Sequence, residues 1–420
     1  MTILVRKAHI VDPHSPFNNT VNDILVRDGV ITEIGASINT KADKVVEPAN
    51  CFASAGWIDL FADFCDPGYE YRETLESGAN AAVAGGYTRV CVIPNTQPVI
   101  DSKGQVEYIT RSSAELPAAV LPLGAATKQC AGKELAEMYD MKASGAVAFT
   151  DALNPVQSPG LLLKALQYVK AFDGTIIQLP DDKTLSAHGL MHEGVISTRL
   201  GLPGIPAIAE ELMVKRDIDL VRYTGSRLHL TGVSTRSSME LIRAAKAEGL
   251  NITVSVTPYH LVFSDEDLVH YDTNLKVSPP LRSKADVQAL REAVSDGTVD
   301  CIASHHRPQH RDNKDCEFEY AKEGMTGIQT AFSVVNTALP GLPVERLVQL
   351  FGENAAKILG QPAARIDKGA PAEFTLFSRD TEWTVNAGEL KSRSKNTPFA
   401  GSRLKGRVVA VINKGKLFLN

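Results

Sequence analysis

Eight short apolar segments recur along the middle of the chain, with helical stretches between them. The segments cover residues 57–64, 87–94, 118–126, 146–151, 175–179, 227–233, 252–258 and 299–305. Several are nearly continuous runs rich in Val, Ile and Thr, as parallel strands buried on both faces are. Stretches typical of helices cover residues 73–84, 105–113, 160–171, 207–221 and 238–248. This alternation predicts an α/β fold whose eight parallel strands close into a (β/α)8 TIM barrel.

An open, doubly wound sheet is the alternative arrangement of such segments. That fold carries a GxGxxG phosphate loop after an early strand, and no such loop follows an early strand here. The barrel is therefore preferred. Because a barrel can use about 250 residues as one unit, a chain of 420 residues leaves room for a second part.

The two ends of the chain differ from its middle. Short alternating strands are expected at residues 3–5, 23–26 and 30–34, and again at 372–377, 406–413 and 416–419. We expect both ends to build one small β-rich domain. The predicted parts are residues 1–52 (β-rich), 53–365 (barrel) and 366–420 (β-rich).

Composition excludes several classes of function. The formal net charge is −5, from 44 Lys and Arg against 49 Asp and Glu, so no strong attraction to nucleic acid or to a membrane surface is expected. No apolar run is long enough to span a bilayer, and the N-terminus lacks the apolar core of a signal peptide. The six cysteines include no CxxC pair, which favours reduced thiols and a cytoplasmic location.

The first predicted strand contains the positions that decide the chemistry of such a barrel. Residues i and i+2 of a strand face the same side, so a His-x-His pair at the strand end would send two imidazoles into the barrel mouth to share a metal ion. Phe61 and Asp63 occupy these two positions. A phenyl ring cannot bind a metal, and a single carboxylate is a weak ligand set.

The most polar stretch of the chain follows the eighth predicted strand. Residues 306–322 read HRPQHRDNKDCEFEYAK. This stretch is interpreted either as a solvated surface loop or as a lid over the barrel mouth.

Several motifs together resemble one known family along essentially the whole chain. The stretch from residue 55 reads AGWIDLFADFCDPGYEYRETLESGANAAVAGGYTRVCVIPNTQPV, and GAVAFTD, LHLTGVST, VTPYHL, PPLR and GMTGIQTAF follow in order. In their residues and their order, these motifs resemble those of the dihydroorotases of the amidohydrolase superfamily. The resemblance implies an amidohydrolase-type barrel and a homodimer.

The family's functional positions in the first half of the barrel are mostly altered. Its paired strand-one histidines fall on Phe61 and Asp63, and its substrate-binding arginine falls on Cys65. Asn95, in the PNT motif, is retained.

The positions at the later strand ends are altered as well. The bridging acidic ligand after strand four falls on Asp151 and keeps its type. The histidines that end strands five and six in the family become Gln178 and Gly232. The asparagine before PPLR becomes Ser278, and the catalytic aspartate of strand eight becomes His305. Among the metal-ligand and base positions, only Asp151 matches the family.

A hydrolytic zinc site needs three protein ligands and an open position for water. The resemblance therefore predicts no bound cofactor and assigns no catalytic residue. If a rearranged site exists, the zinc ligands would be Asp63, Asp151 and His305, with Cys65 able to add a thiolate. A nucleophilic pair of Cys65 and His305 is a further possibility that no sequence spacing supports.

These observations predict an inactive relative of dihydroorotase. Family members that lack the metal ligands are associated with aspartate transcarbamoylase, so the resemblance implies a structural role beside that enzyme in de novo pyrimidine biosynthesis. The alternative is a metal-dependent cyclic-amide hydrolase with a rearranged ligand set. His229 and His260 are expected to serve the hydrogen bonding of the barrel framework.

Overall fold

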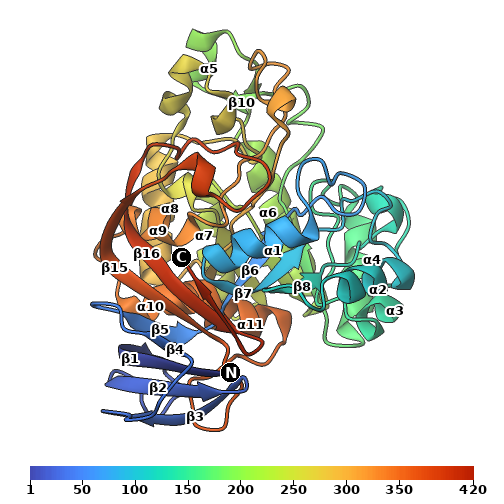
Figure 1. Ribbon diagram of the computed structural model, residues 1–420. Helices are drawn as coiled ribbons and strands as arrows, with labels where there is room; N and C mark the ends of the chain where they lie inside the picture. Colours follow the sequence, from blue (N-terminus) through green and yellow to red (C-terminus); the bar gives the residue numbers. More distant parts are fainter.

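The computed structural model describes all 420 residues and contains a parallel barrel beside an eight-stranded sheet (Figure 1). The barrel strands are β6 (Trp57–Ala62), β7 (Tyr87–Val92), β8 (Ala119–Pro122), β9 (Thr175–Gln178), β12 (Arg227–Leu230), β13 (Ile252–Val256) and β14 (Cys301–Ile302). They pair in parallel in the orders β6-β7-β8 and β9-β12-β13-β14.

Two sets of isolated bridges close these strands into a ring. Phe149 pairs with Gly124 after β8 and with Ile176 in β9, and His306 pairs with Ala62 in β6. The predicted barrel is confirmed. The predicted strand at 146–151 is reduced to the bridges at Phe149, and the eighth strand is shorter than expected.

Helices surround the barrel, and the five predicted ones are all present with ends shifted by a few residues. The predicted helices are α1 (Leu75–Ala84), α2 (Lys103–Ser112), α4 (Pro159–Lys170), α6 (Ile208–Thr224) and α7 (Arg236–Ala247). The structure adds α3 (Met138–Ala143), α8 (Lys284–Asp296), α9 (Ala331–Ala338), α10 (Val344–Val348) and α11 (Asn354–Leu359). Several begin where a side-chain oxygen accepts a backbone N–H of the first turn, as Thr74, Ser158, Thr235 and Ser283 do. No helix is both long and apolar enough to cross a membrane.

The small sheet joins both ends of the chain, as expected. Its order is β17-β16-β15-β5-β1-β2-β3, with β4 paired to β1. The strands are β1 (Thr2–Val11), β2 (Val21–Arg27), β3 (Val30–Gly35), β4 (Lys44–Val46), β5 (Phe52–Ala55), β15 (Phe374–Thr384), β16 (Arg403–Asn413) and β17 (Lys416–Leu419). The boundary predicted after residue 52 falls inside β5.

Two segments leave these two layers. A short arm contains β10 (Met191–His192), α5 (Val195–Leu200) and β11 (Gly204–Ile205), and it projects at the top of Figure 1. Residues 385–402, between β15 and β16, depart from the sheet and reach the barrel mouth, where they bond to Arg72 and Glu73.

Trp57 anchors the joint between the barrel and the small sheet. It is fully buried, and its ring lies within 5.3 Å of the rings of Phe332, Phe351 and Phe377, measured between centroids. Gly86 passes close to this ring with a φ of +96°, a backbone conformation that favours glycine.

Gly86→Ala should lower the free energy of unfolding by at least ~3 kcal/mol, since the new Cβ would lie 2.6 Å from the Trp57 ring and the φ angle is strained. Gly249→Ala is the matched control, because Gly249 also has a positive φ but open space around it. The control should cost only about 1 kcal/mol. Urea unfolding measures both; equal losses would show that the Trp57 contact does not matter.

Candidate functional site

The side chains at the barrel mouth contact one another and leave almost no space. The Phe61 ring stacks on the His305 ring with centroids 4.4 Å apart and planes 25° apart. The cavity that remains between Phe61, Asp63, Ser278 and His305 measures about 10 Å³. That is about the space one water molecule needs. The mouth is therefore filled by protein.

One ring nitrogen of His305 makes a hydrogen bond inside the barrel. Nε2 of His305 lies 2.8 Å from Oγ1 of Thr231, and the hydroxyl of Ser255 donates to the same Thr231 oxygen over 2.8 Å. Ser255 in turn contacts Nε2 of His229 at 3.0 Å. A hydrogen-bonded chain thus runs from His305 into the barrel interior. Burial lowers the pKa of His305 to about 3, so the ring is neutral near pH 7.

Asp63 is held by an ion pair. Nη2 of Arg72 donates to Oδ2 of Asp63 over 2.8 Å, and the backbone N–H of Cys65 donates to Oδ1 over 2.9 Å. Nε of Arg72 donates to the carbonyl of Pro308 over 3.1 Å. Both carboxylate oxygens of Asp63 therefore already accept hydrogen bonds from the protein.

Gly232 is required by the position of His305. Its φ is +68°, and a Cβ placed on it would lie 2.6 Å from Cε1 of the His305 ring. A side chain at this position cannot coexist with the ring as it stands. The absence of a histidine at Gly232 and the presence of one at His305 are thus coupled by packing.

The remaining predicted site residues serve the framework. Asp151 accepts from the backbone N–H of Thr127 over 2.8 Å and also from the Thr127 hydroxyl. Nδ2 of Asn95 donates to the carbonyl of Asp151 over 3.2 Å. Nε2 of Gln178 donates to the carbonyl of Val156 over 3.2 Å. Ser278 is half-buried at the edge of the residual cavity.

Cys65 has none of the features of a nucleophile. It is buried, with 1% of its surface exposed, and burial raises the pKa of its thiol well above the ordinary value. Its Sγ approaches the carbonyl of Asp63 at 3.8 Å, and it has no hydrogen bond to His305. The structure does not support the Cys65–His305 pair. All six cysteines are free thiols.

The two framework histidines behave as expected. His229 lies between the hydroxyls of Thr253 and Ser255. His260 lies between the Thr257 hydroxyl at 2.8 Å and the Pro280 carbonyl at 3.1 Å. Both rings are buried, and both are satisfied by the barrel itself.

Known proteins resemble the chain over its full length. The profile of the family described as "Dihydro-orotase-like" matches residues 53–238. The chain is 42% identical to a protein named "Dihydroorotase" from Pelotomaculum thermopropionicum, over 100% of this chain and 99% of that one. It is 41% identical to a protein of the same name from Anaeromyxobacter dehalogenans (strain 2CP-1), over 99% and 97%. The chain belongs to the dihydroorotase-like family.

Solved structures of amidohydrolases share the fold. The L-hydantoinase (dihydropyrimidinase) of Arthrobacter aurescens superposes with a TM-score of 0.85, covering 99% of this chain and 95% of that one at 22% identity. A D-hydantoinase superposes with a TM-score of 0.83 at 20% identity, with the same coverage. The amidohydrolase-type barrel with its β-rich second part is thereby confirmed.

The residues present do not fit the metal centre that the fold implies. Nowhere in the chain do three His, Cys, Asp or Glu side chains lie where one metal ion could be held. The ligand set of Asp63, Asp151 and His305 considered from the sequence is not assembled. Each of the three is bound to a different partner, namely Arg72, Thr127 and Thr231.

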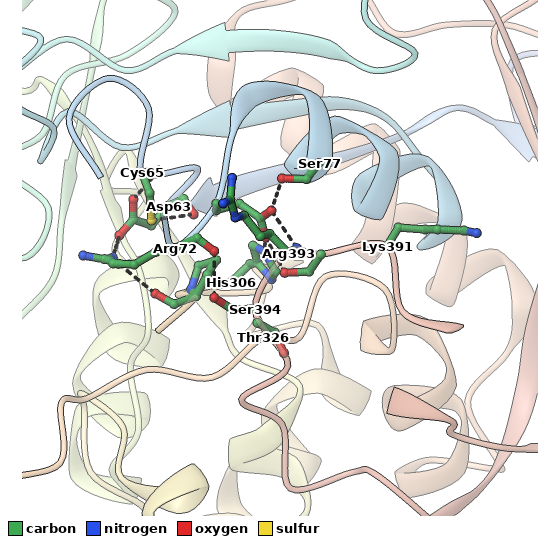
Figure 2. Close-up of polar contacts among 12 residues, drawn as sticks. Asp63, Cys65, Arg72, Ser77, His306, Thr326, Lys391, Arg393 and Ser394 are labelled. Carbon is green, nitrogen blue, oxygen red and sulfur yellow. Dashed lines mark hydrogen bonds and ion pairs between the residues drawn. The ribbon is translucent and has the colours of Figure 1, made fainter. Parts of the chain in front are cut away.

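A second cluster at the mouth, centred on Glu73, was missed by the sequence analysis. Glu73 is fully buried, and its Oε2 lies 3.3 Å from Nε2 of His306. Nδ1 of His306 accepts from the backbone N–H of Gly327, so Nε2 carries the proton and donates to Glu73. The hydroxyls of Ser77 and Ser392 also donate to Glu73. Figure 2 shows Ser77 and His306 of this cluster beside the Asp63–Arg72 pair.

The charge of Glu73 is maintained by these donors. Burial alone would raise the pKa of its carboxyl, but the hydrogen bonds from His306, Ser392 and Ser77 outweigh that effect and hold the pKa below its ordinary value. The sequence offered one clue only, the ETLES stretch at the start of a predicted helix. Ser77 lies within that stretch, but the second serine partner of Glu73, Ser392, lies 319 positions away.

The polar stretch 306–322 combines the two interpretations considered for it. His306, Pro308 and Gln309 are buried at the mouth, whereas His310, Arg311 and their neighbours are exposed. The beginning of the stretch therefore closes the mouth, and the rest forms a surface loop with one 3-10 turn, Arg311–Asn313.

Buried His229, His260 and His305 should each make the protein less stable as the pH drops below about 6.5, because they stay neutral in the folded state. Burial lowers their pKa values to about 3, 4 and 3, so the unfolded chain takes up protons first. His305→Asn, which tolerates the positive φ of this position, should flatten the slope by about 1 kcal/mol per pH unit.

Urea unfolding at a series of pH values between 7 and 5 measures the two slopes. Asp59, Asp151 and Asp217, whose pKa values burial raises to about 6, act in the opposite direction in both proteins and cancel in the comparison. Identical slopes would show that His305 is protonated in the folded state.

Proposed function

We propose that this chain is a dihydroorotase-like protein of pyrimidine biosynthesis that lacks dihydroorotase activity and acts as a structural partner of aspartate transcarbamoylase. The observation that carries the proposal is the stack of Phe61 on His305, which fills the position where a metal ion and substrate would meet. The family membership supports the pathway, since similar proteins over the full length are named dihydroorotase.

The chemistry of the mouth supports the absence of hydrolysis. An amidohydrolase that activates water through zinc lowers the pKa of that water from about 16 to about 7. The mouth offers neither the ligands for such an ion nor space for a cyclic substrate. Cys65 occupies the position of the family's arginine and offers no guanidinium to bind a substrate carboxylate.

The partnership is supported by what the chain has kept. It has the barrel and the two-ended sheet, and it covers 99% of the length of the relative from Pelotomaculum thermopropionicum. A structural partner needs a stable surface of the right shape, but it does not need an open mouth. We propose that the chain forms a homodimer in the cytoplasm, in keeping with its reduced cysteines.

The second candidate is a cyclic-amide hydrolase with a rearranged ligand set. The identity of 41–42% to proteins named dihydroorotase favours this candidate. The two functions separate in a hydrolysis assay with dihydroorotate, because only the hydrolase would require a metal and release product.

Restoring the family's ligand set should not restore activity. The variant carries Phe61→His, Asp63→His, Gln178→His, Gly232→His and His305→Asp. The φ of +68° at Gly232 and the nearby Leu179 side chain would still strain a histidine there, and Asp151 would remain bound to Thr127. A misplacement of about 1 Å can cost about 100-fold in rate. We expect weak zinc binding and hydrolysis at least about 100-fold below a positive control.

Metal analysis after dialysis and dihydroorotate hydrolysis check this, with the Pelotomaculum thermopropionicum relative as the positive control and the unaltered chain beside it. Efficient turnover by the variant with five substitutions would mean that the rest of the site is still arranged for catalysis. Stoichiometric zinc in the unaltered chain, lost on Asp151→Ala, would support the hydrolase instead.

The scaffold role predicts a stable complex with the aspartate transcarbamoylase of the same organism. Specific interfaces bury on the order of 1,200–2,000 Å², which is enough to survive size-exclusion chromatography at micromolar concentrations. Light scattering on the column should give one larger species from the mixture and a homodimer for this chain alone. L-hydantoinase, with the same fold, is the matched control and should elute separately. Separate elution of this chain as well, with both proteins folded, would contradict the role.

A further inference from the structure

A cleft of about 630 Å³ lies outside the closed mouth, between the loop after His306 and the segment Lys391 to Asn396, named here the strap. Five basic side chains line it against one acidic side chain, Asp315: His310, Arg311, Lys314, Arg393 and Lys395. The chain as a whole has more acidic than basic residues, 49 against 44. The cleft is therefore a local concentration of positive charge on a protein of the opposite net sign.

The strap presents its cations through strict alternation. Lys391, Arg393 and Lys395 are exposed, and Ser392, Ser394 and Asn396 between them are buried. The alternation in burial leaves the three cations on the solvent side of the strap. Figure 2 shows Lys391 pointing away from the hydrogen-bonded cluster.

The buried residues of the strap fix its backbone in place. Ser392 donates to the Glu73 carboxylate, and the backbone N–H of Arg393 donates to Oε1 of Glu73 over 2.9 Å. The Ser394 hydroxyl donates to the carbonyl of Arg72 over 2.7 Å. Nδ2 of Asn396 donates to the carbonyl of Gly324 over 3.0 Å. Because these anchors are buried, the outer cations sit on a rigid base.

Several of the cations lack a carboxylate partner. Arg393 makes no side-chain hydrogen bond or ion pair, and Lys395 donates only to the carbonyls of Leu390 and Ser392. Lys314 donates to the carbonyl of Thr273 over 2.8 Å, and burial lowers the pKa of its amine to about 7. Arg311 is paired with Asp315 at 3.2 Å, and Nδ1 of His310 lies 3.3 Å from Oδ2 of Asp312. Arg393 and Lys395, both on the strap, therefore keep an uncompensated positive charge.

We propose that this cleft binds a nucleotide carrying a diphosphate or triphosphate group. The cations come from two segments of the chain, the strap and the 309–315 loop, so several phosphate groups can be bound at once. The planar fork of Arg393 matches phosphate oxygens. The volume lies within the roughly 300–1,000 Å³ typical of small-molecule sites.

Tyr71 supplies the one aromatic surface of the cleft. Its ring is half exposed and meets the His310 ring edge-on, with centroids 6.0 Å apart. A nucleobase can stack on such a ring while the phosphates reach Arg393 and Arg311. An acidic segment of a protein partner would use the cations but would have no need of the confined volume. This inference is independent of the proposed function.

Isothermal titration calorimetry of the full chain with pyrophosphate, ATP and adenosine at low salt tests the proposal. Pyrophosphate and ATP should bind, ATP more tightly, and adenosine should not bind measurably. Raising the salt should weaken binding by screening. Arg393→Gln and Arg311→Gln, one on each segment, should each raise the Kd by about tenfold to hundredfold, because each removes a charged hydrogen bond.

Arg27→Gln is the matched control, since Arg27 is an exposed, unpaired arginine in β2 of the small sheet. It should leave the Kd unchanged. Absence of binding by both pyrophosphate and ATP at millimolar concentration to folded protein would overturn the proposal. An equal loss in the control would overturn it too, by showing non-specific attraction. Arg393→Gln disrupting a complex with aspartate transcarbamoylase, without any pyrophosphate binding, would assign the cleft to a protein partner instead.

Discussion

The seam between the first and last barrel strands determines most of what this protein can do. Asp59 accepts hydrogen bonds from the backbone and hydroxyl of Ser304, and the backbone N–H of Asp63 donates to the carbonyl of His306 over 2.8 Å. These contacts close the barrel. They also bring residues 305 and 306 directly against the residues that follow β6, so the identity of the side chains at this seam decides whether the mouth is open or filled.

In this chain the seam is filled on both sides. The ring of His305 stacks on the ring of Phe61, and Gly232 has no side chain that would clash with the His305 ring. His306 bonds to Glu73. Phe61, Gly232 and His305 therefore form one packed set at the mouth, in which the identity of each residue depends on the others. One fold can carry different sites, which fits the general separation of fold from function.

The contacts at this seam also hold the strap in place beside the mouth. Glu73, buried beside His306, binds the strap from the far end of the chain and fixes its backbone. A pocket at the strand ends of a barrel normally holds the substrate. Here the space at the strand ends is nearly filled, and the larger, charged cleft is lined by the strap and the loop after His306.

The sequence by itself determined the barrel, the two-ended sheet and the family. Strand and helix periodicity are local properties, and Phe61, Asp63, Gln178 and Gly232 could be placed at strand ends because the motifs fix the alignment. Only the tertiary structure decided what these residues contact. The stack of Phe61 on His305 joins positions 244 residues apart, the difference between 305 and 61, and the bond from Ser392 to Glu73 joins positions 319 apart. No periodicity records such pairs, because barrel closure, rather than chain proximity, brings them together.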